Sequence, residues 1–198
     1  MPTTEPFDTA HRLLGAHLIG RGVTVRITEV EAYDGANDPG SHAFRGRTPR
    51  NDVMFGPAGH LYCYFSYGMH TCCNYVCGPE GRAAAVLLRA GEVIDGVALA
   101  RERRRTKSDQ NLARGPACLT QALGIELGDN GMALHDEGSP VRVEWSDRLP
   151  QNTIRSGPRV GVGGPGGDGT SYPWRFWIDG DPTVSAYRAA KPRRRHSG

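Results

Sequence analysis

Lysine is almost absent from this sequence of 198 residues. Of its 24 basic residues only Lys107 and Lys191 are lysine, so arginine carries nearly all of the positive charge. The chain therefore offers few amines for Schiff-base chemistry, which needs an amine as the nucleophile. Arginine suits bidentate contacts with phosphate, although a GC-rich coding bias also accounts for the ratio. Because the formal net charge is only +3, charge alone argues weakly for an anionic partner.

Long apolar segments are also missing. No apolar run approaches the roughly 18 residues of a membrane-spanning helix, and the first residues show no signal-peptide pattern. We therefore expect no membrane association and a cytoplasmic location, at the nucleoid if the source is bacterial. With 38% hydrophobic and 23% charged residues, the composition is that of an ordinary globular domain. We predict a single domain over residues 1–188 that acts as a monomer, followed by a basic, disordered tail over residues 189–198.

The cysteines lack any Cys-x-x-Cys motif and include an adjacent pair. An odd number crowded into one segment does not fit a disulfide framework, and we expect most of these thiols to be small core residues. A metal site that also uses His60 and His70 is the alternative, but the usual ligand spacing is missing. We predict no metal and no cofactor. The cysteines are Cys63, Cys72, Cys73, Cys77 and Cys118.

Residues 23–33 predict a β-strand, because β-branched residues alternate there with a period of two. In an unbroken alternation one face begins with apolar side chains and ends with Glu29, Glu31 and Tyr33. A carboxylate on the apolar face of a strand should be desolvated, paired or functional. The alternative is that the strand frays near Glu29 and both acids meet water.

Periodicity and turn residues predict the other elements. We expect a helix over residues 7–19, with Asp8 or Thr9 as its N-cap. Strands at 60–67 and 71–77 should form a hairpin, and a buried strand at 83–90 ends in Arg89, whose charge needs a partner. Further predictions are a long functional loop at 34–59, a basic helix at 101–107, a helix from Gly115-Pro116 through Leu123, and strands at 141–145, 159–162 and 174–178.

Several motif blocks follow one another along the chain. They include Glu29-Val-Glu-Ala-Tyr33, Ser41-His42, Gly46-Arg-Thr-Pro-Arg-Asn51, Gly59-His-Leu-Tyr62, Tyr67-Gly-Met69, Ala85-Val-Leu-Leu-Arg89, Gly115-Pro116 and Pro158-Arg-Val-Gly161. Together they resemble the alkyladenine (3-methyladenine) DNA glycosylase family, which excises alkylated and deaminated purines, over nearly the whole chain. Val30, Cys63 and Ser66 depart from the family pattern. These changes leave the range of substrates open.

The resemblance implies roles for the residues around the base to be removed. Glu31 corresponds to the general base that activates the attacking water, and Arg89 to the arginine that helps to hold this water. Tyr33, His42 and Tyr64 correspond to the aromatic walls that stack on the extruded base.

The resemblance also implies contacts with the rest of the DNA. Tyr67 corresponds to the hairpin residue that fills the gap left by the base, and Asn74 to a residue that crowds the exocyclic amine of normal guanine. We further predict that Arg47, Arg50 and Met69 contact the DNA backbone.

The implied fold is α+β, a single mixed domain with an antiparallel-rich curved β-sheet, surrounding helices and a protruding β-hairpin. The implied partner is double-stranded DNA with damaged purines such as 3-methyladenine, with hypoxanthine and ethenoadenine as further candidates. The target nucleotide must be flipped out of the stack, and bond cleavage builds oxocarbenium character that an ionised Glu31 stabilises. We therefore expect Glu31 to need a cationic or donor partner, with Arg89 the first candidate.

Neither lysine lies in the motif blocks, so we predict a monofunctional glycosylase without AP-lyase activity, and the terminal amine is the formal alternative nucleophile. Two other functions stay open. A protein that binds lesions without catalysis would keep Tyr67 and the arginines but would not need Glu31. A metal-dependent hydrolase would use His60, His42 and the cysteines.

Overall fold

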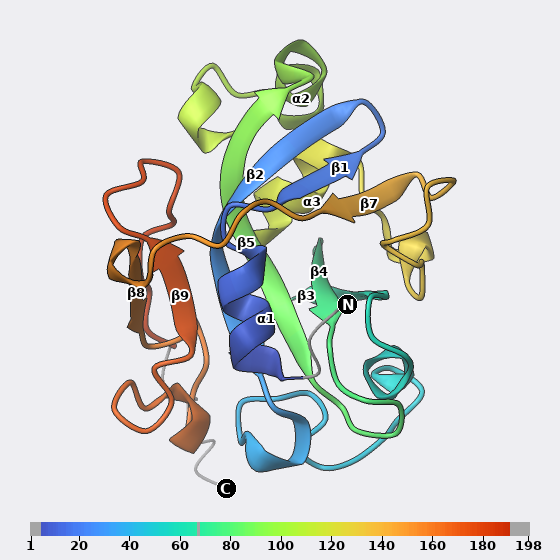
Figure 1. The fold of residues 1–198 in the computed structure, drawn as a ribbon, viewed down its shortest axis with the longest axis vertical. Coiled ribbons are helices and arrows are strands. Elements are labelled where there is room, and N and C mark those ends of the chain that lie inside the picture. The colour runs from blue at the N-terminus through green and yellow to red at the C-terminus, as the bar shows by residue number, and fades with distance from the viewer. Residues whose placement is uncertain (1–4, 67, 191–198) are drawn as a thin grey trace, which may run out of the picture.

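The computed structural model describes residues 5–66 and 68–190. Its centre is a curved antiparallel β-sheet (Figure 1), in which the described strands follow the order β3-β4-β5-β2-β1-β7. Strand β6 pairs with β5, and β9 pairs with both β2 and β8. The strands are β1 (His17–Gly20), β2 (Val23–Tyr33), β3 (Leu61–Ser66), β4 (His70–Val76), β5 (Ala85–Asp95), β6 (Ala113–Arg114), β7 (Val141–Glu144), β8 (Ile154–Gly157) and β9 (Arg175–Ile178).

The described residues form three α-helices, α1 (Pro6–Leu13), α2 (Val97–Arg104) and α3 (Pro116–Leu123). Helix α1 packs against β2 and β5, and α3 packs against β4 and β5 (Figure 1). The prediction of an α+β fold with a curved, antiparallel sheet is therefore confirmed. Strands β3 and β4 form the predicted hairpin, and Tyr67 at its turn lies outside the described residues, as do residues 191–198 of the predicted tail.

Strand β2 has the bounds that the sequence predicts, and it lies in the middle of the sheet. Its first half pairs with β1, its second half pairs with β9, and β5 runs along its whole length. Because the second half has a neighbour on each side, Glu29 and Glu31 are fully buried. The alternative that the strand frays and exposes both acids is wrong.

The prediction of an unbroken alternation along β2 is also wrong. The ladder with β5 shifts its register between Ile27 and Glu29 and again between Glu29 and Val30. At these two shifts Thr28 on β2 and Arg89 on β5 are left without an opposite partner, and a further shift between Thr24 and Val25 does the same to Ile94. An extra residue of this kind is a β-bulge, which re-aims the side chains beside it.

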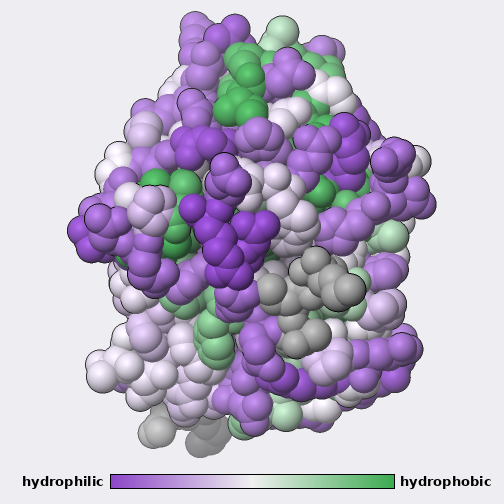
Figure 2. Space-filling model, viewed as in Figure 1, coloured by the Kyte–Doolittle hydropathy of each residue, from purple (hydrophilic) through white to green (hydrophobic). Residues whose placement is uncertain are grey.

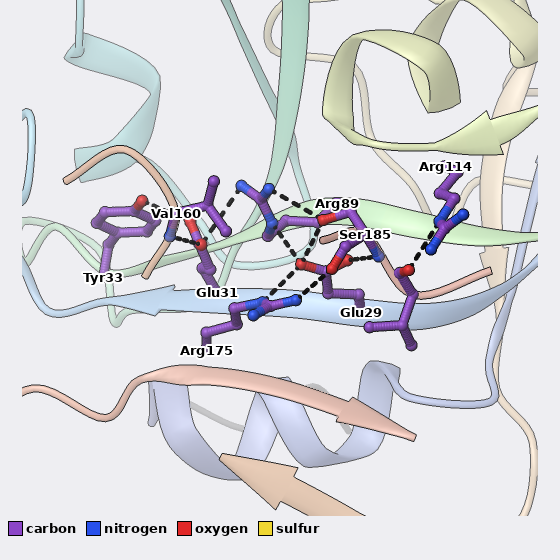
Figure 3. Close-up of polar contacts among 9 residues, drawn as sticks. Glu29, Glu31, Tyr33, Arg89, Arg114, Val160, Arg175 and Ser185 are labelled. Carbon is purple, nitrogen blue, oxygen red and sulfur yellow. Dashed lines mark hydrogen bonds and ion pairs between the residues drawn. The ribbon is translucent and has the colours of Figure 1, made fainter. Parts of the chain in front are cut away.

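The bulge changes which side chains of β2 face the core. Val30 and Ala32 join the earlier apolar residues of the strand in the main hydrophobic core, although an unbroken alternation would turn them away. Glu29, Glu31 and Tyr33 extend together from one side of β2 (Figure 3) and are absent from this core. The acids are therefore not a continuation of the apolar face, and the core is complete without them.

The first predicted helix is too long. Helix α1 ends at Leu13, and residues 17–19, which were predicted to be helical, belong to β1, which lies between β2 and β7. Gly15 between these elements has a φ of 84°, a conformation that glycine adopts at little cost. Leu18 is buried in β1, and a helix would have buried it too. The apolar spacing alone therefore did not distinguish helix from strand. The helix is capped at Glu5 instead of Asp8 or Thr9.

Two predictions in the second half differ from the structure. Residues 159–162 form no strand, and β8 lies just before them and pairs with β9. The basic helix begins earlier and ends earlier than predicted, at Val97 and Arg104. The predicted helix from Pro116 to Leu123 is confirmed, and Gly124 ends it with a φ of 68°.

Hydrophilic residues cover most of the face seen in Figure 2, where apolar residues form only small, separate patches. No helix within residues 5–66 and 68–190 is long and apolar enough to cross a membrane.

Candidate active site

Glu29 is held by four donors in the centre of the sheet (Figure 3). Its Oε1 accepts hydrogen bonds from Nε of Arg89 at 2.8 Å, Nε of Arg175 at 2.7 Å and Oγ of Ser185 at 2.9 Å, and its Oε2 accepts one from the Ser185 amide at 2.7 Å. Burial raises the pKa of Glu29, but the positive charges of Arg89 and Arg175 outweigh it, so the pKa is lowered. These contacts occupy both oxygens, and Glu29 is suited to a structural role.

Glu31 is equally buried but less fully engaged (Figure 3). Its Oε1 accepts a hydrogen bond from the Val160 amide at 2.6 Å and lies 3.3 Å from Nη1 of Arg89. Its Oε2 accepts one hydrogen bond, from the Tyr33 hydroxyl at 2.9 Å. All of these partners are hydrogen-bond donors or cations. The predicted pairing of Glu31 with Arg89 is present.

The β-bulges explain how one arginine contacts both acids. Arg89 has no opposite partner in the ladder between β5 and β2, and Glu29 and Glu31 lie on either side of the irregular pairing. Its guanidinium can therefore enter the space between the two carboxylates, with Nε toward Glu29 and Nη1 toward Glu31. The side chain is 6% exposed, so these charge pairs are shielded from water.

Arg159 is a site residue that the sequence analysis missed. It is buried, and its guanidinium donates to both oxygens of Asp38, at 2.5 and 2.6 Å, and to the Ala32 carbonyl at 3.0 Å. The same guanidinium lies 4.5 Å from the centre of the Tyr33 ring. A Cβ at Gly40 would come within 2.5 Å of its Nη2, so a residue without a side chain leaves room for it.

Arg159 positions its neighbour in sequence as well. The residue that follows it, Val160, donates its amide to Glu31, so one loop supports both Glu31 and the Tyr33 ring. The signal available in the sequence was the block Pro158-Arg-Val-Gly161. Because this block was predicted to be a strand, Arg159 was not recognised as a buried residue of the site.

Aromatic side chains gather near Glu31. The His42 ring meets the Tyr64 ring edge to face at 4.6 Å, and its Nδ1 lies 3.2 Å from the Tyr62 hydroxyl. Burial, then Cys72 and the charge of Glu31, raise the pKa of Tyr64, which places this ring within electrostatic range of the carboxylate. Tyr33 therefore contacts Glu31 directly, Tyr64 lies within range of its charge, and His42 packs against Tyr64.

Partial burial of the His42 ring lowers its pKa below 6.5, and the positive charge of Arg50 lowers it further. The Arg50 guanidinium lies 5.9 Å from the Tyr64 ring centre and donates to the Phe65 carbonyl at 3.2 Å. Asn74 on β4 is buried, and its amide nitrogen donates to the Tyr62 carbonyl at 3.1 Å.

The other predicted DNA contacts lie at the surface. Met69 is 72% exposed in the turn of the hairpin. Arg47 is exposed and forms an ion pair with Asp52. Both are accessible to a partner, whereas Tyr67 lies outside the described residues.

The cysteines give no sign of a shared reactive site. Cys63, Cys72, Cys73 and Cys77 are buried, and burial raises the pKa of Cys63 and Cys77 to about 12. In the described part of the chain, no three histidine, cysteine, aspartate or glutamate side chains are grouped so as to hold a metal ion.

A partly open cleft of about 420 Å³ lies beside these residues. Its lining includes Arg89 and Val160, the two residues that contact Oε1 of Glu31. The carboxylate is therefore buried by protein on most sides and adjoins a space large enough for part of a ligand.

Comparison with known proteins gives consistent matches over most of the chain. A family model described as methylpurine-DNA glycosylase matches residues 2–182. A protein of Streptomyces avermitilis is 55% identical over 196 residues, covering 96% of this chain and 91% of the relative. A protein of Nocardia farcinica is 55% identical over 93% of this chain and 88% of its own length. A protein of Mycobacterium tuberculosis strain H37Rv is 52% identical over 93% of this chain and 90% of its own length. All three carry the name "Putative 3-methyladenine DNA glycosylase".

Proposed function

This chain belongs to the methylpurine-DNA glycosylase family, and we propose that it excises damaged purines, 3-methyladenine among them, from double-stranded DNA. The observation that carries the proposal is the setting of Glu31. It is a buried carboxylate that is contacted by donors and a cation, one of them the Tyr33 hydroxyl, and two of its partners, Arg89 and Val160, line a cleft.

Recognition begins when the damaged nucleotide leaves the duplex. The bond to be cut lies inside the base stack, so the nucleotide has to rotate outward, and a damaged base costs least to unstack. We propose that Tyr33, His42 and Tyr64 stack on the extruded purine. Because aromatic faces attract positive charge, such a pocket favours cationic alkylated purines.

Hydrolysis follows from the position of Glu31. We propose that its carboxylate takes a proton from a water molecule whose oxygen attacks C1′ of the sugar. The bond between C1′ and the purine nitrogen breaks, its electrons leave with the base, and a cationic methylated purine thereby becomes neutral. The negative charge of Glu31 stabilises the oxocarbenium character of the sugar. Arg89 holds the carboxylate and helps to orient the water.

Two further residues complete the proposal. Tyr67 fills the space that the base leaves in the duplex, and Asn74 limits the pocket by crowding the exocyclic amine of normal guanine. The buried amide of Asn74 is held by the Tyr62 carbonyl, which supports a fixed orientation. Met69 in the turn of the hairpin and Arg50, which bonds to the Phe65 carbonyl of β3, contact the DNA backbone, together with Arg47.

We propose hydrolysis without strand cleavage by a monomer. Lys107 is exposed in the loop that follows α2, and Lys191 lies outside the described residues. Among the described residues no lysine contacts Glu31, which supports hydrolysis without a Schiff base to the sugar. Because DNA is the proposed substrate, the site of action is the cytoplasm, at the nucleoid of a bacterial cell.

The test uses duplexes that each carry one methylated adenine, hypoxanthine or ethenoadenine. Free base and abasic sites are measured, and strands are analysed with and without alkali. We expect release of methylated adenine, with strand breaks only after alkali treatment. Tight binding of lesion duplexes without base release would instead indicate a lesion-binding protein. Strand breaks without alkali would contradict the monofunctional mechanism. Release or retention of hypoxanthine and ethenoadenine shows whether the substrate range extends beyond methylated adenine.

A further inference from the structure

The cleft beside Glu31 is lined by three arginines, Arg89, Arg114 and Arg188, and by no carboxylate among its described lining residues. Arg89 and Val160 in its lining also contact Glu31. The cleft and the proposed catalytic group therefore share a wall.

The charges around this cleft do not cancel. Arg89 and Arg175 face Glu29 and Glu31, so two positive charges balance two negative charges in the centre of the sheet. Arg114 and Arg188 are additional. Within residues 5–66 and 68–190 neither guanidinium meets a carboxylate. The surplus positive charge is concentrated in a cleft, where it attracts anions most strongly.

Arg114 is held in place by its backbone and by one hydrogen bond. It lies on β6 opposite Ala90 of β5, and Ala90 in turn lies opposite Glu29 of β2. Two strand spacings, about 10 Å, therefore separate its backbone from that of Glu29. Its Nε donates to the Val184 carbonyl at 2.8 Å (Figure 3). The two outer nitrogens have no partner among the described residues and form a fork of donors.

We propose that Arg114 and Arg188 bind a backbone phosphodiester of the DNA, next to the nucleotide whose base is released. The inference rests on the proposed function. Every sugar of a DNA strand has a phosphate on each side, so a sugar placed before Glu31 brings a phosphate toward the cleft. Guanidinium groups match the geometry and charge of phosphate. Such a contact fixes the position of the sugar and carries no sequence information.

The first test measures the binding of duplex DNA as a function of salt concentration. Arg188→Ala removes an exposed side chain that supports no described contact, and Arg114→Lys keeps the charge of the more enclosed residue. We expect Arg188→Ala and Arg114→Ala to weaken binding several-fold and to reduce the slope of log affinity against log salt by about 1 each. Arg114→Lys should retain most of the slope.

The matched control is Arg142→Ala on β7, at the other end of the sheet from the hairpin. Its guanidinium lies 3.2 Å from Glu144 at the surface, and its removal should leave the salt slope unchanged. Thermal unfolding of each variant shows whether the fold is intact. Wild-type slopes in both Arg114→Ala and Arg188→Ala would overturn the proposal.

The second test changes the DNA. A single uncharged methylphosphonate replaces the phosphate on either side of the lesion, and binding is measured with the wild type and with Arg114→Ala. At one of the two flanks we expect the neutral linkage to weaken the binding of DNA by the wild type. With Arg114→Ala the same linkage should cause little further loss of affinity, because the substitution and the neutral linkage remove the same contact. Fully additive losses at both flanks would contradict a direct contact.

Both tests measure DNA binding and do not depend on release of the base. If the wild type binds lesion duplex through the two arginines but releases no base, the glycosylase proposal fails while the phosphate site stands. If base release occurs and the arginine variants bind like the wild type, the phosphate site fails alone.

Discussion

The backbone amide of Val160 lies 2.6 Å from Oε1 of Glu31. The two residues are far apart in sequence, and the contact ties the loop after β8 to the middle of β2. Because Arg159 in the same loop binds Asp38 and stacks on Tyr33, this loop supports both the proposed base and one wall of the pocket. The geometry of Glu31 therefore depends on a segment without regular structure.

Glu31→Gln should retain the fold and the binding of lesion DNA. Base release should fall by at least about 10²–10⁴-fold, because an amide cannot take the proton of the attacking water. Single-turnover excision of methylated adenine and a binding titration measure both properties. Glu92→Gln, an exposed glutamate on β5, is the matched control and should excise like the wild type. Near-normal excision by Glu31→Gln would rule out the proposed mechanism.

Glu29→Gln should act on stability. The change leaves two buried arginines facing a neutral amide, and we expect a loss of about 3–5 kcal/mol in the free energy of unfolding. The lowered pKa of Glu29 sets the pH dependence. Its charge stabilises the fold fully above the unfolded value of 4.5, and this contribution disappears as the pH falls toward the lower folded value.

Urea unfolding at pH 7, 5 and 3.5 checks this expectation. The difference in the free energy of unfolding between the wild type and Glu29→Gln should be largest at pH 7. It should be smaller at pH 3.5, where protonation of Glu29 reduces its stabilising contribution in the wild type. A difference that stays constant across this range would show that the charge of Glu29 is not what stabilises the site.

Asp38 and Arg159 should behave as a coupled pair. Asp38→Asn or Arg159→Met alone leaves a buried charge without its partner and should cost about 3–5 kcal/mol. The double variant should cost clearly less than the sum, since both charges are then gone. The exposed pair Arg155 and Asp179 serves as the control, with about 0–1 kcal/mol expected. Additive losses for the buried pair would contradict this coupling.

His42 should remain neutral to a lower pH than an ordinary histidine, because partial burial and the charge of Arg50 both lower its pKa. In Arg50→Ala the pKa of His42 should rise, since a nearby positive charge is removed. An NMR titration of the ring measures this directly. No upward shift in the variant would contradict the contribution of Arg50.

The same titration has a consequence for binding. A protonated His42 repels a cationic purine, so the binding of methylated adenine should weaken as the pH falls through the lowered pKa of His42. In Arg50→Ala the weakening should begin at a higher pH. Binding of the neutral purine hypoxanthine provides the control, because it should lack this repulsion.

Tyr67→Ala should reduce the preference for damaged over undamaged duplex, because the flipped state loses the ring that fills the gap in the stack. The ratio of the two affinities is the measurement. Phe65→Ala removes an exposed ring of β3 and should change the ratio much less. Equal effects of the two substitutions would argue against a specific wedge at Tyr67.

Local signals determined much of the fold. The alternation of β-branched residues defined β2 from Val23 to Tyr33, and Pro116 and Gly124 marked the ends of α3. The motif blocks identified Glu31 and Arg89, which do lie together. Periods of two, proline at a helix start and glycine at a helix end act over a few residues, so they can be recognised in the sequence.

The structure alone decided which way the acids of β2 point. The position of a bulge depends on how two strands pair, and the sequence of either strand does not contain that register. The unpaired Thr28 moves Val30 and Ala32 into the core and turns Glu31 toward Arg89, itself unpaired on β5. The sequence determined that a strand carries Glu31, and the register of the sheet determined what that carboxylate faces.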